Sequence, residues 1–176
     1  MAELVFLRRR NRCFEDNLMD DILILMNEYS DTDLNCSLAS GDTPETIYQA
    51  FSMVASAYGK YGSGIQSHML QVVLEKDEIK DMYQVFSIFE QIQYYIGSEF
   101  QVVVGISEYD DAYVGTYLFN SISYKTGRKF VDNNAALNNM KNWMETELGL
   151  EVEFSHGSLW GQGEACFTQQ WYSDNK

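Results

Sequence analysis

Three carboxylates stand close together near the middle of the chain. Glu108, Asp110 and Asp111 fall in GISEYDDAYVGTYLFN, residues 105–120, where an acidic turn separates two apolar runs. Carboxylate oxygens suit Mg²⁺, so metal-assisted chemistry is the first possibility to weigh. Adjacent aspartates tend to point apart, however, and acidic turns are common on acidic proteins. We therefore predict no metal site, no catalytic residue and no cofactor.

The same turn has the composition of a protein-binding surface. Tyr109 and Tyr113 flank the carboxylates. Carboxylates pair with Arg and Lys, while tyrosine rings add contact area at low entropic cost. We predict a partner-binding surface composed of Glu108, Tyr109, Asp110, Asp111 and Tyr113. The alternative is a solvated loop whose charges serve only solubility.

The net charge favours a basic protein partner over nucleic acid. The 176 residues include 26 acidic and 12 basic side chains, for a formal charge of −14. DNA binding depends on basic side chains, so most of this surface should repel DNA. Two basic strips are exceptions, and each is either a local DNA contact or an ordinary solvated charge run. They comprise Arg8, Arg9, Arg10 and Arg12, and Lys125, Arg128 and Lys129.

Length and composition indicate one globular domain in the cytoplasm. A chain of 176 residues is long enough for one sizeable core. No apolar run approaches the roughly 20 residues that a membrane span needs. The first residues place a short apolar stretch before the arginines, which is the reverse of a signal peptide. The three cysteines, Cys13, Cys36 and Cys166, are widely spaced, so we expect reduced thiols.

Hydrophobic periodicity predicts helices that alternate with strands. Strands 100–107 and 113–124 should form an antiparallel pair in the middle of the sheet, with helix 79–97 on one face. This pattern is typical of an α+β fold, with helices packed on one face of an antiparallel sheet. Helices are expected over 17–29, from Thr43 to about Gly59, over 79–97, and from Asp132 or Asn133 to Gly149. Further strands are expected over 66–74 and 150–154, with a turn at 125–128.

The order of elements from 34 to 150 resembles the relaxase or mobilisation nuclease family of plasmids and conjugative elements. The most specific part of the resemblance is NSISYKTGRKF, residues 120–130. A second part is SHMLQVVLEKDE, which fits the family's pattern of a histidine followed by a strand and a downstream glutamate; these two residues are His68 and Glu78 here. The resemblance covers about two thirds of the chain. It implies one relaxase-like domain over 1–176, with 1–33 as a divergent N-terminal extension and 155–176 as a C-terminal tail.

The resemblance also implies that the family's chemistry is lost here. In the family, alternating strand histidines hold a divalent metal, and a tyrosine near the N-terminus attacks the scissile phosphate. His68 and Asn120 alone remain of the motif, and Tyr29, the only early tyrosine, lacks the family's surrounding residues. We therefore expect no enzyme activity. The corresponding histidine positions are Ser107, Ala112, Val114 and Thr116.

Three functions remain open on this basis. The first is a non-catalytic protein of a mobile genetic element that mimics the charge of DNA and binds a basic nucleic-acid-handling protein. An inhibitor of a host defence nuclease, of the anti-CRISPR type, is one concrete form. The second is a conjugation or mobilisation accessory protein that binds a relaxase, or binds DNA weakly. The third is an active DNA nickase with a substituted metal site.

Overall fold

The structure is a computed structural model that describes residues 1–9, 18–28, 35–37 and 43–159. The predictions for Arg10, Arg12 and Tyr29, for Cys13 and Cys166, and for the tail from residue 160 fall outside these ranges.

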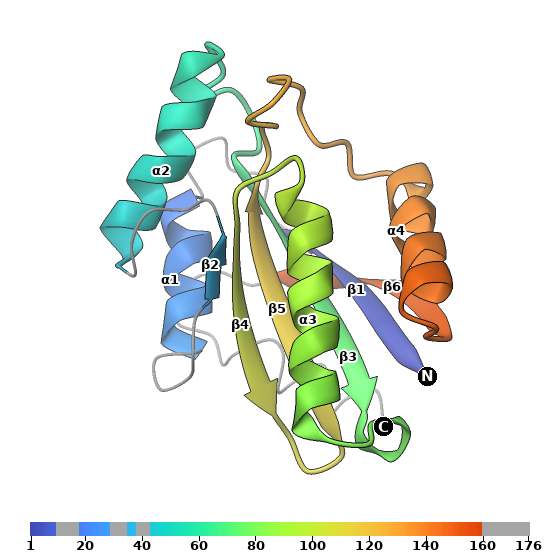
Figure 1. The fold of residues 1–176 in the computed structure, drawn as a ribbon. Coiled ribbons are helices and arrows are strands. Elements are labelled where there is room, and N and C mark those ends of the chain that lie inside the picture. Colours follow the sequence, from blue (N-terminus) through green and yellow to red (C-terminus); the bar gives the residue numbers. More distant parts are fainter. Residues whose placement is uncertain (10–17, 29–34, 38–42, 160–176) are drawn as a thin grey trace.

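The described strands form one six-stranded sheet in the order β2-β4-β5-β3-β1-β6 (Figure 1). Neighbouring strands run antiparallel, except that β6 lies parallel to β1. The β4–β5 pair is therefore near the centre, as its apolar sequence predicts, and this expectation is confirmed. The strands are β1 (Ala2–Arg9), β2 (Asn35–Ser37), β3 (Ser67–Glu75), β4 (Val102–Glu108), β5 (Ala112–Asn120) and β6 (Val152–Leu159).

The helices begin where the sequence provides a capping side chain. Thr43 and Thr46 form a reciprocal capping box at the start of α2, with Pro44 in the first turn. Asp81 and Asn133 accept backbone hydrogen bonds at the starts of α3 and α4. The helices are α1 (Leu18–Glu28), α2 (Pro44–Ala57), α3 (Met82–Gly97) and α4 (Asn134–Glu147), with a short 3₁₀ turn, η1 (Lys76–Glu78).

The helices cover both faces of the sheet. Alternate strand residues such as Val104 and Tyr117 pack in a core cluster with α3 and α4. Their neighbours Val103 and Leu118 pack in a second cluster with α1 and α2. Figure 1 shows α3 crossing in front of the central strands. The α+β class is confirmed, but the helices do not lie on a single face as the sequence led us to expect, because both faces of the central strands are apolar.

Two further features differ from the sequence expectations. Residues 1–33, assigned above to a divergent extension, contain β1 and α1, and both belong to the body of the fold. Strand β1 sits between β3 and β6, and Leu4 at its middle is fully buried. Residues 35–37, where no strand is expected from the sequence, form β2 at one edge of the sheet. No helix in the described part of the chain is long and apolar enough to cross a membrane.

Candidate functional site

The acidic turn predicted from the sequence connects β4 to β5 at one end of the sheet. The backbone N–H of Tyr109 donates to the carbonyl of Ala112 at 2.8 Å, which closes the turn. The side chains of Glu108 and Asp110 are exposed, whereas Tyr109, Asp111 and Tyr113 are half-buried. The turn therefore presents two carboxylates to solvent beside partly anchored rings.

Lys76 of η1 anchors this turn to the end of β3. Its Nζ lies 2.6 Å from Glu108 Oε1 and 4.9 Å from the centre of the Tyr113 ring. Its backbone N–H donates to the carbonyl of Asp111 at 3.0 Å. The hydrogen bond to Glu108 raises the pKa of Lys76 above its usual value. These contacts hold η1 and the turn as one surface.

Further carboxylates from η1 and the start of α3 enlarge this surface into what we call the acidic end. Three cations offset it: Lys76, Lys80 and the amino group of Met1, which forms ion pairs with Glu78 and, at 3.5 Å, with Glu75. In Figure 1 it lies at the bottom of the molecule, where β3 and β4 finish. The acidic end consists of Glu75, Asp77, Glu78, Asp81, Glu108, Asp110 and Asp111, all exposed except the half-buried Asp111.

Helix α3 carries exposed aromatic side chains on the face turned away from the core. Tyr83 is 87% exposed, Phe86 48% and Tyr94 64%. Their spacing of three and eight residues places them on one side of the helix. The outer face of α3 therefore mixes these aromatic rings with exposed polar side chains, Ser87, Glu90 and Gln91. We call Tyr83, Phe86 and Tyr94 the α3 stripe. This stripe was not predicted from the sequence, although the helical spacing of the three aromatic residues can be read from it.

The described part of the first basic strip, the backbone of Arg8 and Arg9, lies at the opposite end of the sheet, as does the second strip. The register that pairs Leu7 with Met69 brings the backbone of Arg8 and Arg9 toward the start of β3. The turn that carries Lys125 and Arg128 follows β5 at that same end. Lys125 Nζ lies 5.8 Å from the centre of the Tyr124 ring, and Arg128 is exposed.

Two lysines at this basic end support the local backbone. Lys60 Nζ donates to the carbonyl of Gly127, and Lys129 Nζ donates to the carbonyl of Ser63. These bonds connect the loop after α2 to the turn after β5. Lys129, predicted as a nucleic-acid contact, therefore has a structural partner, whereas Lys125 and Arg128 extend from an exposed turn.

The positions that correspond to the family's histidines lie on one face of the central strands. Ser107 is paired with Val114, and Thr116 with Gly105. Ala112, Val114 and Thr116 are buried, and Gln71 Nε2 donates to Thr116 Oγ1 at 3.0 Å. These positions share one face of the strands, and their side chains include none of the His, Cys, Asp or Glu ligands that metal sites use. Within the described ranges, no three His, Cys, Asp or Glu side chains are grouped so that they could hold a metal.

His68 and Asn120 lie on opposite faces of the sheet, so the structure does not bring them into one site. His68 contacts phenylalanine rings on the face covered by α3 and α4, and burial lowers its pKa to about 4. Asn120 lies on the other face, where its Nδ2 donates to Gln101 Oε1 at 2.9 Å and to the carbonyl of Phe51 at 3.1 Å. Both side chains are surrounded by core contacts.

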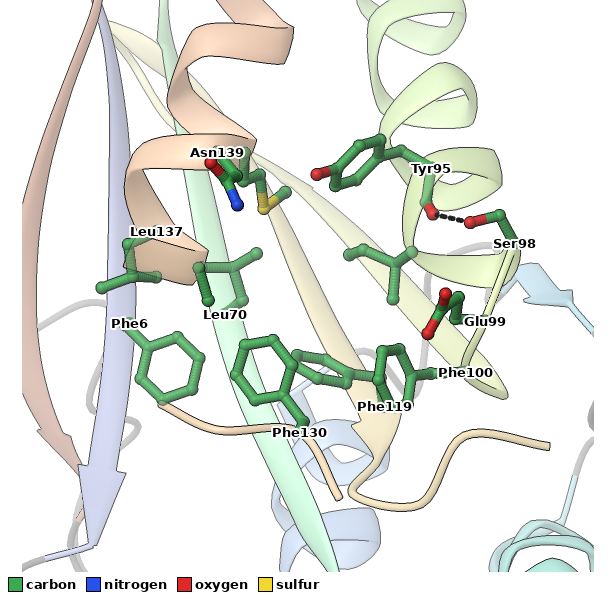
Figure 2. A pocket seen from close by; sticks show the side chains of 13 residues that line it. Phe6, Leu70, Tyr95, Ser98, Glu99, Phe100, Phe119, Phe130, Leu137 and Asn139 are labelled. Carbon is green, nitrogen blue, oxygen red and sulfur yellow. Dashed lines mark hydrogen bonds between the residues drawn. The ribbon is translucent and has the colours of Figure 1, made fainter. Parts of the chain in front are cut away.

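A cavity of about 280 Å³ opens between the end of α3 and the start of α4 (Figure 2). Phenylalanines from four separate segments, Phe6, Phe100, Phe119 and Phe130, contribute to its lining. Sequence reasoning missed this cavity, because nothing in the local sequence signals that these rings converge.

These features define the protein as an α+β sheet protein with acidic and basic ends and an apolar cavity between two helices. No protein-family model, curated protein or solved structure matches the chain. The resemblance to relaxases therefore stays an interpretation of the sequence.

Proposed function

We propose that this chain is a non-catalytic binding protein that captures a basic, nucleic-acid-handling protein through its acidic end. The observation that carries the proposal is the grouping of seven acidic side chains at the acidic end, offset only in part by two lysines and the Met1 amino group. Such a surface attracts a basic groove and accelerates association with it. It also repels nucleic acid, the competing occupant of that groove.

The α3 stripe supplies the apolar contacts that charge alone does not provide. Tyr83 and Phe86 lie in the first two turns of α3, close in sequence to the acidic residue Asp81 that caps the helix. Binding energy at protein interfaces is concentrated in a few aromatic and arginine side chains, whereas peripheral charges mainly set the association rate. We therefore assign affinity to Tyr83 and Phe86 and assign steering to the carboxylates.

The concrete form that we propose is inhibition of a nuclease by imitation of DNA charge. The sequence resemblance to a DNA-handling family of mobile elements supports this context, and mobile elements benefit from blocking host defence nucleases. An anti-CRISPR-type inhibitor would need no active site of its own. Inhibition would then need only that the acidic end occupies the basic groove of the nuclease and keeps DNA out of it.

Charge reversal at the turn tests the proposal. Glu108, Asp110 and Asp111 are changed to Lys, and Glu147, Glu151 and Glu153, exposed on or near α4 and β6, are reversed as a matched control with the same change in net charge. Each protein is immobilised, host proteins are captured, and bound species are identified by mass spectrometry and tested for nuclease inhibition. We expect a basic partner that the parent and the control retain and the turn variant loses.

Two results would contradict the proposal. One is equal capture by the parent and by the turn variant at low salt. The other is a partner without a basic surface, or a nuclease whose activity the parent leaves unchanged.

A second candidate, a DNA-binding accessory of conjugation, is favoured by the basic end. The backbone of Arg8 and Arg9 and the turn with Lys125 and Arg128 lie at the same end of the sheet. A salt-dependent affinity for single-stranded DNA that falls in a Lys125→Ala, Arg128→Ala variant would support this candidate.

A further inference from the structure

The cavity between α3 and α4 has an aromatic floor. The Phe130 ring meets the Phe119 ring edge-on at 5.1 Å and the Phe100 ring edge-on at 5.8 Å. Phe6 stacks on Phe130 at 6.0 Å from the other side. A cavity of 150 Å³ lined by apolar side chains is enough for benzene, so about 280 Å³ accommodates a larger ring system with a short substituent.

The upper part of the cavity is polar. Tyr95 and Asn139 contribute to its lining, and Figure 2 shows the Tyr95 hydroxyl and the Asn139 amide facing each other across it. Glu99 also lines the cavity but lies lower, beside Phe100. Within the described chain, none of these three side chains has a hydrogen bond or ion pair to another side chain or to the backbone. An apolar floor with a few polar groups around it, here half-buried Tyr95 and the exposed side chains of Glu99 and Asn139, is typical of a small-molecule site.

The polar rim carries negative charge. Glu99 follows α3 by two residues, and the carbonyl end of a helix is itself partially negative. Burial and the nearby Glu99 carboxylate raise the pKa of Tyr95, which keeps its hydroxyl protonated. The rim therefore favours a cation and disfavours an anion.

The helices hold this site open at a defined width. Tyr95 of α3 stacks on Trp143 of α4 with ring centroids 4.4 Å apart. This contact joins the helices beside the cavity.

We propose that the cavity binds a small aromatic molecule that carries a protonated amine. The ring lies on the phenylalanine floor, and the amine meets Glu99, with Tyr95 and Asn139 as further hydrogen-bonding groups. Aromatic faces also attract cations directly. This proposal is independent of the acidic end and would hold whichever partner binds there.

Three probes that share one ring test the proposal by isothermal titration calorimetry with the full chain: tryptamine, indole and indole-3-acetate. We expect tryptamine to bind about two- to fivefold more tightly than indole, because an ion pair with the exposed Glu99 contributes roughly 0.5–1 kcal/mol. Indole-3-acetate should bind most weakly. No saturable binding of any probe, or equal affinity for all three, would overturn the proposal.

Variants of the cavity locate the binding. Glu99→Gln should reduce tryptamine affinity to that of indole and leave indole affinity unchanged, whereas Glu90→Gln on the outer face of α3 should change neither. Ala136→Phe places a ring in the cavity and should abolish binding of both probes. Thermal melting of each variant confirms that it is folded. Unchanged tryptamine binding by folded Glu99→Gln or Ala136→Phe protein would show that the probe binds elsewhere.

Discussion

The imidazole of His68 stacks on the ring of Phe119, with centroids 5.5 Å apart and planes inclined by 26°. Phe130 meets the same imidazole edge-on at 4.9 Å, and Phe6 lies 5.7 Å away. Burial lowers the pKa of His68, and the nearby carboxylate of Asp132 raises it by a smaller amount. His68 is thus a neutral member of an aromatic cluster.

His68 should make the fold less stable in mild acid. Its pKa is about 4 in the folded chain against 6.5 for the unperturbed group. Between these values the unfolded chain takes up a proton that the folded chain does not, so stability is full above pH 6.5 and falls as the pH drops toward 4. A difference of about 2.5 pH units corresponds to about 3 kcal/mol.

The measurement is urea unfolding across pH 4 to 7.5 for the parent and for His68→Phe. The parent should lose stability relative to the variant as the pH falls, which separates His68 from the carboxylates that titrate in both proteins. His156→Gln, at an exposed position, is the control and should follow the parent. Parallel pH profiles for the parent and His68→Phe would refute the assignment.

Asn120 should be important for stability. Its Nδ2 donates to Phe51 and Gln101, and its Oδ1 accepts from the backbone N–H of Ile122 at 3.0 Å. Asn120→Ala leaves buried polar groups without partners, and we expect a loss of about 2–4 kcal/mol in the free energy of unfolding. Asn138→Ala, on the exposed face of α4, should change stability by less than about 0.5 kcal/mol. Equal effects in chemical denaturation would show that the hydrogen bonds of Asn120 contribute nothing.

Periodicity was enough to predict the elements that contain an uninterrupted apolar pattern. Strands β3, β4 and β5 and helices α3 and α4 fall within a few residues of their expected positions. The consecutive apolar residues Val102, Val103 and Val104 are buried on both faces of the sheet, which is why helices cover both faces and not the single face that we expected. Strand β1 was missed because its apolar residues lead directly into arginines, and β2 because it is only three residues long.

The candidate sites were predictable only where they are local in sequence. The acidic turn lies within residues 108–113, so its composition identified it directly. Its connection to Lys76 depends on the register that pairs Glu75 with Ala112, and no local pattern encodes that register. The cavity depends on rings at positions 6, 100, 119 and 130, which only the folded chain brings together.

Gly127 should tolerate a side chain less well than Gly62, although both have positive φ values, 67° and 70°. A Cβ at Gly62 meets nothing within 4 Å, whereas one at Gly127 would overlap the Tyr58 ring. Gly62→Ala should therefore cost only the backbone strain, roughly 1 kcal/mol. Gly127→Ala should cost a further 1–3 kcal/mol, approximately, from the overlap.

Thermal denaturation of both variants distinguishes these two costs. Adding Tyr58→Ala to Gly127→Ala removes the overlapping ring, so the double variant should lose less stability than the sum of its single changes. Strict additivity, or equal destabilisation at both glycines, would mean that the packing of Tyr58 on the turn is not as described.

The last prediction concerns catalysis. Ser107, Ala112, Val114 and Thr116 share the sheet face where strand histidines would hold a metal, and none of them has a side chain that binds a divalent cation as imidazole does. The purified protein should therefore neither nick supercoiled plasmid nor form a covalent adduct with single-stranded DNA in the presence of Mg²⁺ or Mn²⁺. An active metal-dependent nickase run in parallel establishes that the assay works. Cleavage by the parent that disappears in Tyr29→Phe would demonstrate a tyrosine nucleophile and restore the nickase hypothesis.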